Sequence, residues 1–361
     1  MKKYTIVIGF FLVFLTLLLC GCQDLFVNDG KTIYQSHPTK IRYTLSYGYN
    51  ISCFDKGKYI INYTCDLPEV LNGQILSTIE HDKNYEEENI ATHNNMYIWN
   101  ITSYITKNYN LGITTSVESE SYIATDLNGE DALSIQEIKN QYQSYVNQYC
   151  QAQSNETTVY IDPNNPIISE IASNLLKSAG TNNSFLAALE IFKWLKQNTR
   201  YQIHIENNSA QPAGITLKYK TGDCDDLSFL YMSLCRSIGI PSRFIRGFLI
   251  EENIAVPHAW VEIFVGPNIG MNGWIPVECA GVSSDIETEI YQNFGLESVN
   301  HLRLFKDDGS NKSLDISLSG ISYMTYGDRK IEVSSFAVVT NYIVVDSNEL
   351  LIDENGNRRY M

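Results

Sequence analysis

Gly222-Asp223-Cys224-Asp225-Asp226 opens the most informative stretch of this 361-residue chain. Apolar residues then recur three and four positions apart, as on the inward face of a helix; they are Leu227, Leu230, Tyr231, Leu234 and Ile238. Gly239 supplies a stop for this helix, with Pro241 just beyond it. The pattern places Cys224 in the first helical turn, where the helix dipole favours a thiolate. We therefore expect a nucleophile at this position.

Two later segments supply the other members of a candidate catalytic set: Pro257-His258-Ala259-Trp260-Val261-Glu262 and Trp274-Ile275-Pro276-Val277-Glu278. Both read as strands. A thiolate can attack an amide or ester carbonyl while a histidine moves the proton, and a carboxylate that accepts the Nδ1–H orients the histidine. We therefore expect Cys224, His258 and Glu278 to form a catalytic triad, with the main-chain N–H of Cys224 as one oxyanion donor.

The same residues have other interpretations. Taken alone, a cysteine near a helix start is more often structural, and a strand histidine is more often a core residue. Three carboxylates surround the thiol and could be capping residues or a weak calcium site; they are Asp223, Asp225 and Asp226. Their charges should raise the pKa of the Cys224 thiol. Because a helix terminus offsets this by only about 0.3–1 kcal/mol, an ion pair with His258 would have to supply most of the difference.

In these segments the chain resembles the transglutaminase-like superfamily, whose core is a papain-like cysteine fold. The resemblance covers about 166–279 and includes the residues around Cys224, the His258 strand and a tryptophan four residues before Glu278. It implies an enzyme that hydrolyses peptides or transfers a glutamine acyl group to an amine. Glu278 departs from the family, which usually has aspartate, and Asp285 is the next candidate. A catalytically inactive surface-binding or structural module is the alternative function.

The order of elements predicts an α+β fold with four regions after a leader. They are a β-sandwich-like domain at 30–130, a helical linker at 131–160, a transglutaminase-like catalytic domain at 161–295 and a C-terminal β-strand extension at 296–361. In the first region, Ile41-Arg42-Tyr43-Thr44-Leu45-Ser46-Tyr47 alternates apolar with polar residues, as half-buried strands do.

Apolar spacing predicts three more helices. The linker helix at 134–150 should bury Ile135, Ile138, Tyr142, Tyr145, Val146 and Tyr149. The helix after Pro166 should bury Ile167, Ile171, Leu175 and Ala179. The helix at 184–198 should bury Phe185, Leu189, Phe192 and Leu195.

The amino terminus reads as an export signal at 1–22. Lys2 and Lys3 precede an apolar run at 5–19. Leu19-Cys20-Gly21-Cys22 resembles the lipobox of lipoproteins, which would make Cys22 the lipidated first residue of the mature chain. The alternative is an uncleaved signal anchor, because about fifteen apolar residues are at the short end of a membrane span. Either interpretation tethers the chain to the outer face of the cytoplasmic membrane.

Composition and cysteine spacing exclude several functions. The formal net charge of −15 argues against nucleic acid, whose phosphates require clustered Lys and Arg. No Cys-x-x-Cys pair is present, and neither a metal nor a cofactor is expected. A hairpin turn at Lys56-Gly57 would set Cys53 and Cys65 too far apart for a disulfide.

The expected partner is a peptide or protein substrate, with cell-envelope peptides as the first to screen.

Overall fold

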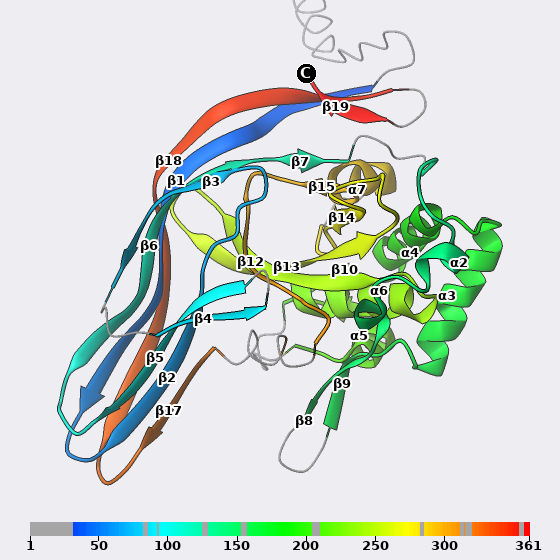
Figure 1. The fold of residues 1–361 in the computed structure, drawn as a ribbon. Helices are drawn as coiled ribbons and strands as arrows, with labels where there is room; N and C mark the ends of the chain where they lie inside the picture. Colours follow the sequence, from blue (N-terminus) through cyan, green and yellow to red (C-terminus); the bar gives the residue numbers. More distant parts are fainter. Residues whose placement is uncertain are drawn as a thin grey trace, which may run out of the picture.

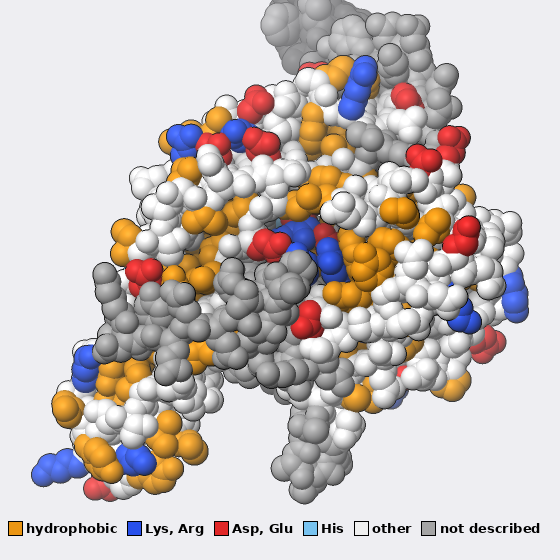
Figure 2. Space-filling model, viewed as in Figure 1, with side chains coloured by type: hydrophobic (Ala, Val, Ile, Leu, Met, Phe, Trp, Pro, Cys, Tyr) orange, Lys and Arg blue, Asp and Glu red, His pale blue; other side chains and the backbone are white. Residues whose placement is uncertain are grey.

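A long curved β-sandwich and a helical domain built on a smaller sheet lie side by side in the computed structural model (Figure 1). Figure 2 shows the same view with all atoms, where hydrophobic and charged side chains are interspersed on the surface. The structure describes residues 32–81, 86–91, 94–124, 129–152, 157–203, 210–281, 285–310, 314, 320–353 and 357–361. The leader expected at 1–22, including Cys22, lies outside the described residues. Across the described ranges, no helix has the length and apolar character needed to cross a membrane.

Two antiparallel sheets form the sandwich. The first has the order β19 (Arg358–Tyr360), β18 (Lys330–Ile352), β1 (Thr32–Phe54), β6 (Asn108–Glu120) and β3 (Gln74–Glu80). The second has the order β17 (Ile321–Thr325), β2 (Tyr59–Asp66), β5 (Asn94–Ser103) and β4 (Glu86–Ala91). The alternation expected at 41–47 is confirmed, because Ile41, Tyr43, Leu45 and Tyr47 are buried. The C-terminal strands complete both sheets by pairing with β1 and β2.

The hairpin expected at Lys56-Gly57 does not form. β1 pairs with β18 on one side and β6 on the other, so both of its edges are occupied. The chain therefore crosses at 55–58 into the second sheet, where β2 pairs with β5 and β17. Cys53 and Cys65 are both buried free thiols. The lack of a bridge between them agrees with the prediction, but the hairpin register given as its reason is wrong.

The helical domain packs α3 (Pro166–Ala179), α4 (Ser184–Asn198), α5 (Ala213–Tyr219) and α6 (Cys224–Ser237) against a four-stranded sheet. This sheet has the order β14 (Trp274–Val277), β13 (Ala255–Phe264), β12 (Ser242–Ile250) and β16 (His301–Lys306). The mixed α+β fold is therefore as predicted. The helices expected at 184–198 and from Cys224 are confirmed, and Gly239, with φ 89°, follows the second of them.

Three short strand pairs and one further helix complete the fold. The pairs are β10 (Arg200–Tyr201) with β11 (Thr221–Gly222), β7 (Tyr122–Ile123) with β15 (Leu296–Glu297), and β8 (Tyr149–Ala152) with β9 (Thr157–Ile161). α7 (Ile286–Asn293) follows β14.

Two helix predictions need correction. The segment 134–150 is not one helix but α2 (Ile135–Ile138), the 3₁₀ turn η1 (Gln143–Val146) and the start of β8. Tyr142 has φ 51°, a left-handed conformation that interrupts a right-handed helix. In α3 Ile171 and Leu175 pack against the core as expected, but the fully buried residues are Ile168 and Ala172, and Ile167 is 62% exposed. Asn165 caps this helix, which places Ile167 on the solvent side of the first turn.

The small sheet is shared between two hydrophobic cores. Phe244 on β12 packs among the helices, together with Ala259 and Val261 from β13. Further along the same strands, Ile250 and Ala255 belong to the core of the sandwich. β12 and β13 therefore run from one core into the other and join the two domains.

A buried arginine ties this sheet together. Arg303 on β16 donates to Glu262 on β13 (2.6 Å) and to Glu297 on β15 (2.8 Å), and all three side chains are 3% exposed. Glu262 also accepts a hydrogen bond from Nε of Arg243 at 2.5 Å, and Glu297 accepts one from the indole N–H of Trp260 at 3.0 Å. Burial would raise the pKa of Glu262, but the charges of Arg303 and Arg243 lower it to about 2. The stability that this depressed pKa contributes is present above the ordinary pKa of glutamate and is lost as the pH falls towards 2.

Arg303→Met should lower the free energy of unfolding by about 3–5 kcal/mol, because two buried carboxylates lose their shared counter-charge. Urea denaturation at pH 7 measures the change. Lys193→Met is the matched control: it breaks a partly exposed pair with Glu190 and should leave the midpoint nearly unchanged. An Arg303→Met protein as stable as the parent would show that the cluster does not hold the sheet.

Candidate active site

Cys224 is positioned by the segment that precedes α6. β10 pairs in parallel with β11, with Tyr201 opposite Gly222, and this fixes the chain two residues before the thiol. Asp226 accepts the N–H of Asp223 at 3.2 Å and the main-chain N–H of Gln211 at 2.5 Å. Of the three carboxylates near the thiol, Asp226 therefore holds the start of the helix.

Position 222, just before the start of α6, requires glycine. A Cβ on Gly222 would lie 2.5 Å from Cβ of Asp226, closer than real Cβ atoms approach. The Gly222-Asp223-Cys224 sequence therefore reflects close packing at the helix start as well as chemistry.

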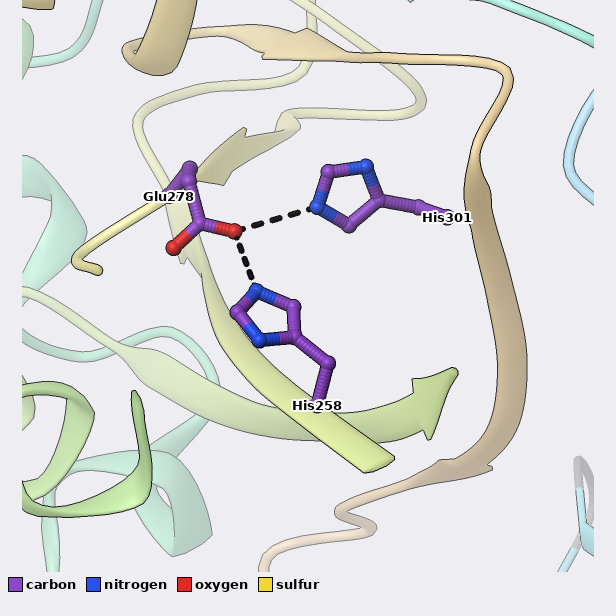
Figure 3. Close-up of side chains that lie close together, drawn as sticks. All are labelled: His258, Glu278 and His301. Atoms are coloured by element: carbon purple, nitrogen blue, oxygen red, sulfur yellow. Dashed lines mark hydrogen bonds and ion pairs between the residues drawn. The ribbon is translucent and has the colours of Figure 1, made fainter. Parts of the chain in front are cut away.

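His258 and Glu278 are in direct contact. Figure 3 shows the Glu278 carboxylate between two imidazole rings: its Oε2 lies 2.6 Å from Nε2 of His258 and 3.0 Å from Nε2 of His301. The other oxygen, Oε1, accepts the main-chain N–H of Ala280 at 2.6 Å. Burial opposes ionisation of Glu278, but His258 and His301 outweigh it and hold its pKa well below the usual range. Glu278 is therefore a fixed carboxylate with both oxygens occupied.

The hydrogen-bonded nitrogen of His258 differs from the expectation. Sequence reasoning assigned Nδ1–H to the carboxylate, whereas Nε2 makes this contact. Glu278 follows the end of β14, and its side chain reaches the ring from the Nε2 side. Figure 3 shows the second ring nitrogen, Nδ1, directed away from Glu278 and His301. With a proton on Nε2, Nδ1 carries the lone pair of the base.

The thiol of Cys224 lies near the main-chain N–H of Ala259, the residue after His258. Ala259 faces α6, whereas His258 projects from β13 towards Glu278 and His301. Between these described residues, Cys224 Sγ and the His258 ring make no hydrogen bond. Catalytic hydrogen bonds are often long in unliganded enzymes and tighten when substrate binds. The structure thus joins two of the three predicted residues directly and places the third beside them.

The thiol of Cys224 is neutral at rest. Burial raises its pKa well above the usual range, and the charges of Asp225 and Asp223 add to this effect. The Ala259 N–H acts in the opposite direction but is weaker. Burial and the neighbouring Asp223 likewise raise the pKa of Asp225 to about 9. A thiol in this environment needs a base at the moment of attack.

His301 belongs to the site but was not predicted. It opens β16, and its Nδ1 lies 2.9 Å from the hydroxyl of Ser298. Trp260 packs edge-on against its ring, with the centroids 4.8 Å apart. No local motif marks His301, because its link to Glu278 arises only when β16 joins the sheet beside β12. A sequence signal could have come only from predicting that sheet order.

Tyr201 lies beside the start of the Cys224 helix, because it pairs with Gly222. Burial raises its pKa to about 12, and the charges of Cys224, Asp223 and Glu278 add to this effect. Tyr201 also lines a cavity of about 260 Å³ between α4, α6 and the segment after β14. Lys196 fixes that segment by donating to the carbonyl of Cys279 at 2.7 Å.

The other predicted residues have structural roles or lie outside the described chain. Asp285 caps α7, where its Oδ2 accepts the N–H of Thr288 at 3.0 Å and the threonine hydroxyl at 2.6 Å. Glu278, and not Asp285, therefore contacts His258. Cys22 lies among the residues that the structure does not describe.

Two groups of side chains have the donor atoms that a metal ion would use. In each, the potential ligand atoms lie within 4.8 Å of one another: His258, Glu278 and His301 in one, and Asp223, Cys224 and Asp225 in the other. In the first group the hydrogen bonds to Glu278 already account for the arrangement.

Known proteins share parts of this architecture. Residues 170–279 match the Transglutaminase-like superfamily and form a domain of that kind. The "Putative Cysteine Protease from Cytophaga hutchinsonii" has a similar structure, with TM-score 0.53 and 15% identity over 92% of this chain and 100% of that chain. At this identity the similarity shows a shared fold.

Two further structures are more distant. The periplasmic domain of TgpA from Pseudomonas aeruginosa gives TM-score 0.31 and 10% identity, over 68% of this chain and 93% of that chain. Red sea bream transglutaminase gives TM-score 0.28 and 10% identity, over 82% of this chain and 72% of that chain. No curated protein matches the chain.

His301→Ala should reduce kcat by less than the factor of about 10²–10⁴ that general acid–base catalysis contributes, because Glu278 loses one of the two imidazoles that fix it while His258 keeps its contact. It should also raise the pKa of Glu278, because one of the two groups that lower it is gone. The pH at which the Glu278 carboxylate titrates, followed by the NMR chemical shift of its carboxyl carbon, should therefore rise. His301→Gln, whose amide N–H can still donate, should recover part of the rate. His37→Ala, which removes a contact with Tyr360, is the control. A parent-like titration of Glu278 would reduce His301 to a packing residue.

Proposed function

We propose that this protein is an exported, membrane-tethered cysteine enzyme that cleaves or transfers amide bonds through Cys224, His258 and Glu278. The observation that carries the proposal is the pairing of His258 Nε2 with the fixed Glu278 carboxylate, on the strand beside the thiol. This pairing leaves Nδ1 as the base. The order of the three residues along the chain, the match of residues 170–279 to the Transglutaminase-like superfamily and the shared fold all support the same reaction class.

Burial of the thiol determines the first step. Because Cys224 is neutral at rest, His258 Nδ1 takes its proton as sulfur attacks the amide carbonyl. A C–S bond forms, and the carbonyl electrons move to oxygen. The main-chain N–H of Cys224 can stabilise that oxyanion. The second donor we favour is the hydroxyl of Tyr201, which pairs with Gly222 two residues before the thiol.

The second half of the reaction reverses the proton transfer. His258 gives its proton to the leaving amine as the C–N bond breaks, and the acyl group remains on sulfur as a thioester. Water then attacks the thioester in hydrolysis, whereas an amine attacks it in acyl transfer. Both hydrolysis and acyl transfer use His258 as the base again, and both release the free thiol. The two outcomes share every residue of the site, so the nature of the acceptor distinguishes a peptidase from an acyltransferase.

A non-catalytic surface module is the second candidate. The raised pKa of the Cys224 thiol favours this second candidate. Within the part of the chain that the structure describes, Cys224 and His258 also make no hydrogen bond with each other, which favours it as well. Alkylation by iodoacetamide at neutral pH discriminates between the two functions. An enzyme should label at Cys224 in preference to the buried Cys235 and Cys279, and His258→Ala should slow the labelling.

Turnover of cell-envelope peptides should depend on the triad in a graded way. Cys224→Ala and His258→Ala should show no measurable turnover, because one forms the covalent bond and the other moves the proton. Glu278→Gln should keep a residual rate about 10²–10⁴-fold lower, the range typical of general acid–base catalysis. Cys235→Ala, on the same helix but fully buried, is the matched control. Equal turnover by Cys224→Ala would remove the proposed nucleophile.

The membrane tether rests on Leu19-Cys20-Gly21-Cys22. Cys22→Ser should leave the protein exported but without lipid. Intact-mass analysis of native protein decides the matter, because a chain that retains Lys2 and Lys3 and carries no lipid would be a signal-anchored protein.

A further inference from the structure

Three turns meet at the end of the sandwich where β1 finishes, and we call them together the sandwich tip. They are 54–58 from β1 to β2, 104–107 from β5 to β6, and 326–330 from β17 to β18. Turns usually carry Gly, Asn, Asp and other polar residues. Here four large apolar side chains are between 38% and 70% exposed: Phe54, Tyr104, Ile105 and Tyr326. Figure 2 shows hydrophobic side chains gathered at this end of the sandwich, with Lys and Arg side chains around them.

A buried arginine holds the three turns together. Arg329 belongs to the third turn and is only 4% exposed. In the first turn it donates to the carbonyls of Phe54 at 3.1 Å and Gly57 at 2.9 Å. In the second turn it donates to the carbonyl of Tyr104 at 2.5 Å. The turns are therefore fixed through their backbones while the apolar side chains face solvent. A partner that binds these side chains would have little backbone left to order.

The sandwich tip is positively charged, whereas the chain as a whole is acidic. Its three segments contain five cations and two anions, against a formal net charge of −15 for the whole chain. Because Arg329 is buried, the accessible cations are lysines: Lys56, Lys58, Lys107 and Lys330. The ammonium of Lys58 lies 5.5 Å from the centre of the Tyr326 ring, so cationic and aromatic groups form one surface. The complement of this surface is an apolar partner with negative charge.

A lipid bilayer fits this combination better than a protein does. Aromatic residues are enriched at the level of the lipid headgroups, and lysines beside them are attracted to anionic lipids. Protein–protein interfaces are instead depleted of lysine. Contact between the tips of two copies of this chain would bring like charges together, which is unfavourable.

We infer that the sandwich tip is a membrane contact that binds anionic phospholipid. Tyr104 and Ile105 are the two most exposed large apolar side chains in the part of the chain that the structure describes. They enter the headgroup region, while the lysines contact lipid phosphates. The contact is separate from the proposed tether at Cys22, because the 23 residues of β1 lie between the tip and residue 32. It goes beyond the proposed function and does not depend on the catalytic chemistry.

Tryptophan fluorescence of Tyr104→Trp measures this contact directly. The substitution is made in the full chain with Cys22→Ser, so that no lipid anchor is present, and the signal of the four native tryptophans is subtracted. The vesicles contain phosphatidylcholine and phosphatidylglycerol with brominated acyl chains, which quench tryptophan at short range. We expect quenching of the introduced tryptophan. Vesicles of brominated phosphatidylcholine alone should need at least about fivefold more lipid for half-maximal quenching, the factor that one lysine contributes at an anionic surface.

Tyr219→Trp is the matched control. Tyr219 is 60% exposed and lies beside the ammonium of Lys218, but it belongs to α5 in the helical domain. Its introduced tryptophan should not be quenched. Because the readout is local, a membrane contact made by the leader does not quench a tryptophan at the tip.

Three results would overturn the inference: no quenching in Tyr104→Trp, equal quenching in Tyr104→Trp and Tyr219→Trp, or equal quenching by the two kinds of vesicle. The first would leave an acidic protein or a glycan as the partner of the sandwich tip. None of these results bears on the proposed chemistry, because turnover by Cys224 is measured separately.

Discussion

The site depends on a buried ion cluster centred on Arg303. Three of its side chains, Arg303, Glu262 and Glu297, are almost fully buried, so each charge needs its partners. Arg303 stands two residues after His301 on β16, and Glu262 stands four residues after His258 on β13. The cluster therefore fixes the two strands that carry both histidines of the site. It also reaches the sandwich, because the Arg303 carbonyl accepts the N–H of Glu69 at 2.7 Å.

The buried carboxylates of the site differ in their ionisation. Glu278 remains ionised because two imidazoles face it, whereas burial and Asp223 favour the neutral form of Asp225. Both environments are buried, so the sign of the nearest charge decides the outcome. The same physics keeps the thiol of Cys224 neutral until a base acts on it. Glutamate at 278 suits this arrangement, because its Oε2 meets both histidines while Oε1 receives a backbone N–H.

Local patterns predicted the parts of the structure that depend on local interactions. The periodic apolar residues after Cys224 and within 184–198 define helices that form as expected. The helix expected at 134–150 fails because periodicity does not reveal a left-handed residue at Tyr142. The hairpin after Cys53 and the role of His301 both depend on which strands become neighbours. Sheet order is set by contacts far apart in sequence, and one-dimensional spacing does not contain it.

The central claim is that Cys224 forms a covalent acyl intermediate with an amide substrate. Acid quenching during turnover, followed by intact-mass analysis and peptide mapping, tests this most directly. The account predicts a mass increase equal to the acyl portion of the substrate, located on Cys224 and removed by hydroxylamine as a thioester would be. Turnover without any adduct, or an adduct on a different cysteine, would contradict it.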